Sequence, residues 1–295
     1  MTTPEFASNR DNFCYRHPGR QSFVLCQRCM RTICPECQTQ GPVGVICPEC
    51  MKAQRKAQSP AQKHANRRWG GGAVAMAGRS GRPMVTYVLL AITSAIGLLQ
   101  LLPGIGGQIT VQLWFRAAYL YPDLSGAPFE PWRMLTVLFV HGGFIHLALN
   151  MLALWMLGQI LEPMLGRGRY LALYLISGLG GSVAVAILDP GAATVGASGA
   201  LFGMMAALLI IGRHVGANVT GILVILVINF VFGVVVGGIS WQAHLGGVVV
   251  GAIIAFIYTR TRRREQRIWQ MVLLAALTVL LLVVVAFVPP ALILG

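Results

Sequence analysis

The chain has 295 residues, of which 56% are hydrophobic and only 11% are charged, and its mean hydropathy is +0.68. A soluble globular domain of this length would carry roughly a quarter charged residues, so the composition excludes an ordinary soluble protein. The formal net charge is +14, and residues 1–82 hold 13 of the 23 Lys and Arg but only 4 of the 9 acids. These values indicate a polytopic membrane protein with a basic, polar N-terminal extension.

The N-terminal segment 1–52 holds all seven cysteines of the chain. The first 80 residues contain no apolar run of the length that a signal peptide needs, so we expect none. Four pairs at C-x2-C or C-x2-H spacing follow one another: Cys14/His17, Cys26/Cys29, Cys34/Cys37 and Cys47/Cys50. Two-residue spacing lets both side chains of a pair turn toward one ion, and eight ligands suffice for two tetrahedral Zn²⁺ sites. The odd number of cysteines, with His17 completing the first pair, favours metal over disulfides. We predict a zinc-binding module with two structural ions, because four protein ligands leave no open position for a substrate.

The spacing of these pairs leaves their partners open. A cross-braced arrangement would put the first and third pairs on one ion and the second and fourth on the other, whereas a sequential arrangement would use neighbouring pairs. The ligand pattern resembles small B-box and zinc-ribbon domains. Reduced thiols indicate the cytosol, where the module could bind a cytosolic protein partner or have a purely structural or targeting role.

Residues 53–82 form a basic linker rich in Ala, Gly and Gln. The simplest interpretation is a solvated tether. Its charge would also attract it to anionic lipid on the cytoplasmic leaflet, at roughly 1 kcal/mol per Lys or Arg near the surface. Because the linker directly precedes a membrane span, lipid and topology explain its charge better than nucleic acid, and no nucleic-acid partner is expected.

Apolar segments predict seven transmembrane helices, since about 20 residues are needed to cross a bilayer. Their ranges are 84–102, 134–160, 169–188, 198–213, 218–236, 241–259 and 270–288. Basic residues gather before the first span and in every second connection after it, whereas the opposite side carries only Arg116 and Arg133. The positive-inside rule therefore predicts a cytoplasmic N-terminus and an outside C-terminus. Without an organelle signal, we expect a multi-pass protein of the cell (plasma) membrane.

Four polar residues fall at similar depth in the outer half of the predicted spans: His146, Asn150, Ser198 and His244. Polar and ionisable groups in a bilayer are costly and indicate function. His146 and Asn150 are four residues apart on the second span, so they project from one helical face. Ser198 begins the fourth span, and His244 lies one turn into the sixth.

Glycines predict that the fourth and sixth spans touch closely. The glycines that follow the two polar residues at helical spacing are Gly199, Gly203, Gly247 and Gly251. If the two glycine faces meet, Ser198 and His244 come together, and the imidazole can take the hydroxyl proton. No acid lies inside a predicted span at this depth, so we predict a Ser-His dyad without a carboxylate. An oxyanion would lie at the N-terminus of the fourth span, where free N–H groups favour negative charge, with His146 and Asn150 as further donors.

The motifs resemble those of the rhomboid family of intramembrane serine proteases. The matching residues are Trp132-Arg133, His146-x-x-x-Asn150, Gly196-Ala197-Ser198-Gly199 and His244-x-x-Gly247-x-x-x-Gly251. Gly196 belongs to this motif, and we group it with the glycines that pack the helices. The resemblance implies a six-helix core at 83–260, and residues 261–295 add a basic loop and a seventh span. We therefore expect an all-α polytopic membrane protein with a small N-terminal zinc-binding domain.

By the same resemblance, Ser198 is the nucleophile, His244 the general base, and His146, Asn150 and the Ser198 N–H the oxyanion hole. Phe202 departs from the many bacterial relatives with tyrosine there: it can stack on His244 but cannot donate a hydrogen bond.

The implied activity is that of a serine endopeptidase, a hydrolase that cleaves transmembrane segments of membrane proteins near the outer side of the bilayer, without a catalytic cofactor. Two alternatives stay open. The chain could be a catalytically inactive rhomboid-like protein that binds membrane clients, or a transporter whose polar residues form a solute site. A transporter predicts internal repeats and broken helices, and no clear repeat is present.

Overall fold

The computed structural model describes residues 10–40, 44–57, 82–235 and 238–294. The chain divides into two compact units, Met1–Ala65 and Asn66–Gly295, which are treated separately below. Most of the linker predicted at 53–82 lies outside the described residues.

The N-terminal unit is small and has little regular structure. Its elements are η1 (Arg10–Asn12), η2 (Pro35–Cys37), the antiparallel strands β1 (Thr39–Gln40) and β2 (Val45–Ile46), and α2 (Pro48–Lys56). The Cys47 sulfur accepts a hydrogen bond from the Cys50 N–H at 3.3 Å, which caps the start of α2. Among the described residues of this unit, the buried apolar ones are Ile33 and five cysteines. So small a core cannot stabilise a domain by apolar burial alone.

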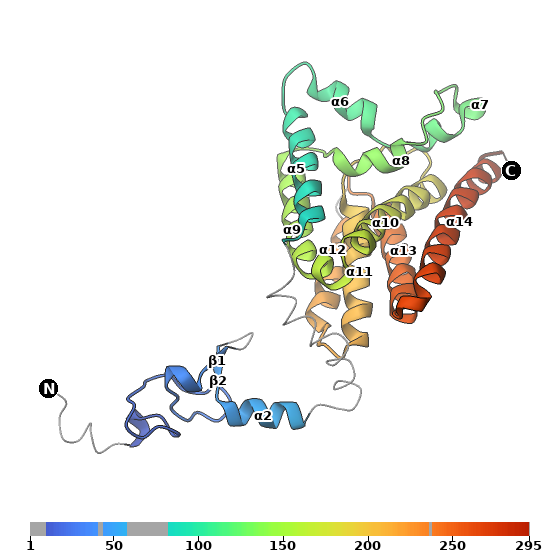
Figure 1. Cartoon of the computed structure of the whole chain (residues 1–295). Helices are drawn as coiled ribbons and strands as arrows, with labels where there is room; N and C mark the ends of the chain where they lie inside the picture. The colour runs from blue at the N-terminus through green and yellow to red at the C-terminus, as the bar shows by residue number, and fades with distance from the viewer. Residues whose placement is uncertain (1–9, 41–43, 58–81, 236–237, 295) are drawn as a thin grey trace. The chain divides into compact units, whose positions relative to one another are not determined.

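The regular elements of the second unit, in its described residues, are helices joined by loops (Figure 1), with one isolated bridge between Phe115 and Thr194. Its long elements are α5 (Met84–Leu99), α9 (Phe144–Leu165), α10 (Arg167–Leu188), α11 (Ser198–His214), α12 (Thr220–Val235), α13 (Trp241–Arg260) and α14 (Arg267–Leu294). Four of these are long and apolar enough to cross a membrane, and the three shorter ones, α5, α11 and α12, are also apolar. The predicted fold class, an all-α polytopic membrane protein, is confirmed.

Short elements follow α5 and lie at one end of the bundle (Figure 1). They are α6 (Gly106–Leu113), η4 (Ala117–Leu120), α7 (Pro122–Ser125), α8 (Arg133–Thr136) and η5 (Val137–Phe139). A further short helix, η6 (Arg264–Gln266), lies elsewhere in the chain and precedes α14. Arg133 holds this region together. Its guanidinium pairs with Glu130, donates to the Val111 carbonyl at 2.5 Å, and lies 4.0 Å from the centre of the Tyr119 ring.

The second span begins later than the sequence predicts. We expected a helix over 134–160, but residues 133–139 form α8 and η5, and α9 begins only at Phe144. Gly143 has φ +128°, a backbone conformation that a helix cannot contain. Gln100 fixes the preceding turn, because its side chain accepts from the His141 N–H at 2.9 Å and donates to the His141 carbonyl at 3.2 Å.

The most extensive helix contact in the described residues joins α11 and α13. A Cβ added at Gly247 would overlap the Gly199 carbonyl, and one added at Gly251 would overlap the backbone of Gly203. The two helices therefore touch backbone to backbone, as the glycine spacing predicts. Gly196 takes no part in this contact: it precedes α11, has φ +117°, and leaves room for the His146 ring.

The seventh helix, α14, lies against α10 and α13 (Figure 1). Near its start, Gln270 accepts from Arg169 at 2.7 Å and donates to the carbonyl and hydroxyl of Thr261 at 3.0 and 2.7 Å. Further along, the Val285 carbonyl accepts from the Tyr121 hydroxyl. Side-chain hydrogen bonds therefore join α14 to α10 and the end of α13 at one point, and to the turn between η4 and α7 at another.

A buried carboxylate caps the first span. Glu162, only 3% exposed, accepts from the N–H groups of Val85 and Thr86 at 3.0 and 2.8 Å and from the Thr86 hydroxyl at 2.7 Å. The first N–H groups of a helix have no partner within it, and α5 follows Pro83, which offers no side-chain acceptor. The negative charge also suits the positive end of the helix dipole.

Glu162→Gln should destabilise the folded protein by about 2 kcal/mol, because the amide loses the charge and turns an N–H group toward a donor. The thermal midpoint in detergent, followed by tryptophan fluorescence, should fall by roughly 4 to 8 °C. Gln159→Ala, which removes an exposed contact with Tyr87 one turn earlier, is the control and should leave the midpoint unchanged. Equal midpoints for both variants would contradict the capping role.

Candidate functional site

The ends of two helices bring a hydroxyl and an imidazole together. Ser198 is the first residue of α11, and its Oγ lies 3.0 Å from Nε2 of His244 in the first turn of α13. Ser240 fixes the start of α13 because its hydroxyl accepts from the Ala243 N–H at 3.3 Å. His244 is 5% exposed. The contact lies at the end of the glycine-lined face where α11 and α13 meet.

The His244 ring is held by packing. It stacks on Phe202, with ring centroids 4.0 Å apart and planes at 10°, and Phe202 meets Phe230 of α12 edge to face. Gly233 of α12 lies against the other ring nitrogen, and a Cβ there would be 2.9 Å from Nδ1. Nδ1 has no hydrogen-bond partner among the described residues. The sequence analysis did not predict a role for Gly233. The one signal that could have indicated it is an isolated glycine in an otherwise apolar helix.

One carboxylate near this region orients the helix rather than the imidazole. Asp189, just after α10, accepts from the Gln242 side chain at 3.2 Å, and the Gln242 oxygen accepts from the Ser240 hydroxyl at 3.2 Å. These contacts lie two and four residues before His244. Among the described residues, no hydrogen bond or ion pair joins an acid to His244, and the dyad stays a prediction.

The two polar residues of α9 lie close to the loop before Ser198. His146 Nδ1 accepts from the Gly142 N–H at 3.3 Å, which leaves the proton of a neutral ring on Nε2. A Cβ at Gly196 would lie 2.9 Å from this Nε2, so the ring faces the loop two residues before Ser198. Asn150 is 6% exposed and donates to the His146 carbonyl at 2.8 Å, while its Oδ1 has no partner among the described residues.

The side chain of His141 is buried, although the residue lies in the loop before α9. It is 5% exposed, and its ring meets that of His146 at 5.1 Å between centroids and 68° between planes. Neither ring nitrogen has a partner among the described residues. Its backbone is fixed by the side chain of Gln100, the residue that follows α5.

Comparison with known proteins decides the family. The sequence model described as "Rhomboid domain" matches residues 128–261. "Putative rhomboid protease YdcA" of Bacillus subtilis is 30% identical over 192 residues, which cover 62% of this chain and 92% of that protein. The chain belongs to the rhomboid family. All four predicted residues, His146, Asn150, Ser198 and His244, lie within the rhomboid match.

Other rhomboid relatives are matched over less of their length. "Rhomboid protease GluP" of Bacillus subtilis is 36% identical over 211 residues, 68% of this chain and 40% of GluP. "RHOMBOID-like protein 5" of Arabidopsis thaliana is 38% identical over 136 residues, 43% of this chain and 44% of that protein. The chain thus spans less than half the length of these two proteins.

The N-terminal unit of this rhomboid lies outside the matched domain and carries two clusters of cysteine and histidine. One consists of Cys14, His17, Cys34 and Cys37, and the other of Cys26, Cys29, Cys47 and Cys50. The first and third pairs therefore come together, as do the second and fourth, which is the cross-braced arrangement. All seven cysteines are free thiols, so the alternative of a disulfide framework is not what the structure contains.

The clusters have dimensions that fit a tetrahedral ion. In each, the ligand atoms lie within 4.8 Å of one another. His17 Nδ1 lies 3.3 and 3.5 Å from the sulfurs of Cys34 and Cys37, and the Cys29 and Cys47 sulfurs are 3.8 Å apart. Zn–S bonds of about 2.3 Å in a tetrahedron give sulfurs roughly 3.7 Å apart, so both clusters could hold Zn²⁺.

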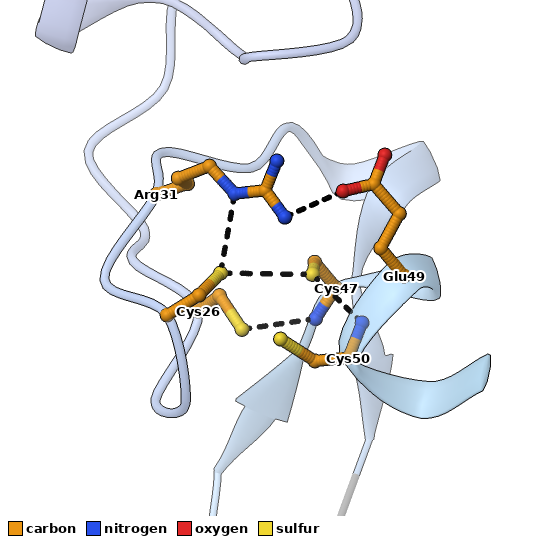
Figure 2. A network of polar contacts seen from close by, with 6 residues as sticks. Cys26, Arg31, Cys47, Glu49 and Cys50 are labelled. Carbon is orange, nitrogen blue, oxygen red and sulfur yellow. Dashed lines mark hydrogen bonds and ion pairs between the residues drawn. The ribbon is translucent and has the colours of Figure 1, made fainter. Parts of the chain in front are cut away.

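Hydrogen bonds around the second cluster favour thiolates (Figure 2). The Cys26 sulfur accepts from the Cys47 N–H at 3.2 Å, and Arg31 donates to the Cys29 sulfur at 3.3 Å while pairing with Glu49 at 2.5 Å. Burial raises the pKa of the Cys26 thiol, but backbone N–H donors outweigh burial and lower the pKa to about 6. A thiolate is the form that binds metal.

Proposed function

We propose that this rhomboid is an intramembrane serine endopeptidase that cleaves transmembrane segments of other membrane proteins. The single observation that carries the proposal is the 3.0 Å contact between Ser198 Oγ and His244 Nε2. Two relatives, GluP and YdcA, are named as proteases, which supports the reaction class. No carboxylate and no metal is needed for the proposed dyad.

In the proposed mechanism, Nε2 of neutral His244 takes the Ser198 proton as Oγ attacks the scissile carbonyl carbon. The carbonyl π electrons move to the oxygen and form a tetrahedral oxyanion. When the C–N bond breaks, the imidazolium returns its proton to the leaving amine, and an acyl-enzyme remains. A water molecule, deprotonated by His244, then releases the acid and regenerates Ser198. The stack on Phe202 would hold the ring in the plane that these transfers need.

We assign the oxyanion site to the start of α11 and to α9. The Ser198 N–H precedes the helical hydrogen bonds and is free to donate at the positive end of the helix dipole. His146 Nε2–H supports this assignment, because Nδ1 is already occupied as an acceptor. The Asn150 amide would supply a further donor. Preorganised donors of this kind contribute about 3 to 4 kcal/mol each to the transition state in serine proteases.

The orientation in the membrane follows from charge. Basic residues precede α5 and gather between α13 and α14, so we place the N-terminus in the cytosol, the C-terminus outside, and the Ser-His pair near the outer side of a cell membrane. Substrate segments must unwind locally to expose a carbonyl, and segments with glycine or proline unwind at lower cost.

The proposal is tested by cleavage of a panel of model transmembrane substrates by the wild-type protein and by Ser198→Ala in proteoliposomes. Cleavage by wild type alone supports it. A folded wild-type protein that cleaves none of them, but retains them in pull-down, is instead a membrane client-binding protein. Solute uptake that is unchanged in Ser198→Ala would favour a transporter.

For the N-terminal unit we propose two structural Zn²⁺ ions with cross-braced ligands, and a role separate from catalysis. The ligand distances support this assignment, and so does the small apolar core, which needs a metal to be stable. A chain that begins at residue 80 should then retain cleavage activity.

Metal analysis of double variants separates the two pairings. Wild type should contain two Zn²⁺ per chain by plasma mass spectrometry. Cys14→Ser/Cys34→Ser should keep one ion, because both residues serve the same site, whereas Cys14→Ser/Cys26→Ser should lose both. The reverse pattern, with one ion kept only in Cys14→Ser/Cys26→Ser, would establish sequential pairing.

A further inference from the structure

Large apolar side chains project from the turn that carries Cys26 and Cys29. The chain folds back on itself here, with the Ile33 N–H donating to the Val24 carbonyl at 2.8 Å and the Cys26 N–H to the Arg31 carbonyl at 2.9 Å. Phe23, Leu25 and Met30, which we call the apolar knuckle, are 72%, 43% and 65% exposed.

The backbone directs these side chains outward. Ser22 and Cys26 are buried, whereas the three residues between them, Phe23, Val24 and Leu25, are exposed, with Val24 the least so at 38%. Met30 ends the turn with φ +59°, the only positive φ of a non-glycine residue in the described chain. The apolar knuckle is therefore the convex tip of a turn. A convex tip fits into a soft or open surface and offers no groove for a helix or strand.

The charge around the apolar knuckle is positive. Arg28 lies on the turn itself and is exposed. Of the three acids among the described residues of this unit, Glu36 and Glu49 are each engaged by an arginine, Arg20 and Arg31 respectively, and the third is Asp11. Residues 10–57 have a formal surplus of +5, and two Zn²⁺ with seven thiolates would leave about +2. Exposed apolar residues next to arginines are the combination that binds the surface of an anionic membrane.

The chain itself keeps a membrane within reach. The segment 58–81, between the last described residue of the N-terminal unit and the first of the helical unit, has 24 residues, and a chain of that length spans at most roughly 85 Å. It carries four Lys or Arg and no acid. A bilayer around the helical unit is thus always present at high local concentration, whereas a soluble partner would have to be recruited.

We propose that the apolar knuckle inserts shallowly into a membrane surface containing anionic lipid, with Arg28 at the headgroup phosphates. The zinc module is then a membrane-docking element, which positions the cytosolic end of the chain close to the bilayer. The proposal concerns residues far in sequence from Ser198 and does not depend on peptidase activity.

The test uses the full-length, zinc-loaded Ser198→Ala protein in nanodiscs with one copy per disc. Hydroxyl-radical footprinting with mass spectrometry measures oxidation of Met30, and Met51 of α2 in the same module is the internal reference. Discs of phosphatidylcholine alone are compared with discs containing about 30% phosphatidylglycerol. Oxidation of Met30 relative to Met51 should fall about threefold or more in the anionic discs.

Matched variants identify the side chains responsible. Leu25→Gln should restore at least half of the lost oxidation, and Arg28→Gln should reduce the difference between the two lipids. Ala53→Gln, an exposed change on α2, is the control and should behave as wild type. Zinc content is measured for each variant, so that an unfolded module is recognised.

Equal oxidation of Met30 in both discs and in detergent would overturn the proposal. Protection that appears only when discs hold two copies would assign the apolar knuckle to self-association instead. Protection that requires added cytosolic protein would assign it to a protein partner. Because Ser198→Ala protein is used, none of these outcomes depends on whether the chain is a protease.

Discussion

Replacing His244 by alanine should abolish substrate cleavage and also the reaction of Ser198 with a fluorophosphonate. Within the described part of the chain, Nε2 of His244 is the one base in hydrogen-bond contact with the Ser198 hydroxyl, at 3.0 Å. An unassisted serine hydroxyl is a poor nucleophile, and loss of the base in a serine protease lowers the rate by about 10,000-fold or more. The Phe202 ring that stacks on His244 has no atom that could accept the proton, so it cannot replace the lost base.

Two readouts make this prediction specific. Cleavage of a transmembrane substrate measures the whole reaction, and fluorophosphonate labelling measures activation of Ser198 alone. His214→Ala is the matched control, because His214 is exposed at the opposite end of α11 and should retain both activities. Labelling of His244→Ala at the wild-type rate would show that another group activates the serine, and the dyad would be rejected.

A side chain at Gly247 should have the second-largest effect. In Gly247→Val the new Cβ would overlap the Gly199 carbonyl, so α11 and α13 must separate. Overpacking a tight contact typically costs about 1 to 3 kcal/mol, and here it also moves Ser198 away from His244. Because a misplacement of about 1 Å can cost 100-fold in rate, activity should fall by about 100-fold or more.

Gly221→Val is the matched control for this change. Gly221 lies on α12, and a Cβ there meets nothing within 4 Å, so the same substitution should leave cleavage and thermal stability near wild type. Both variants are compared by cleavage rate and by thermal midpoint in detergent. Full activity of Gly247→Val would mean that α11 and α13 can separate without disturbing the proposed site.

The helices of the second unit could be anticipated because their signal is local. Apolar runs long enough to cross a bilayer predict seven spans, and the structure has an apolar helix at each of these places. The start of the second span was wrong by ten residues. Residues 134–143 are mostly apolar, but the backbone at Gly143 and the hydrogen bonds between Gln100 and His141 separate them from α9. Gln100 and His141 are 41 residues apart, so local sequence does not reveal this contact.

The glycine spacing also carried information about distant contacts. Gly199, Gly203, Gly247 and Gly251 allow two backbones to approach, and residues at their N-terminal ends must then lie together. The roles of Ser198, His244, His146 and Asn150 in catalysis stay predictions until the variants are measured. The packing of Gly233 against His244 and the hydrogen bond from Gln242 to Asp189 were not predicted. A single glycine in a helix, or a single acid in a loop, has no spacing pattern that would indicate its partner.

The sequence by itself determined the membrane class, the spacing of the Cys and His pairs in the N-terminal unit and the helix faces that can touch, since each depends on composition or on spacing within one segment. Only the tertiary structure decided which pairs share a cluster, because cross-braced and sequential arrangements have identical local spacing. It also decided what surrounds the His244 ring: Phe202 lies on α11 and Gly233 on α12, and the packing of these helices against α13 brings both to the imidazole.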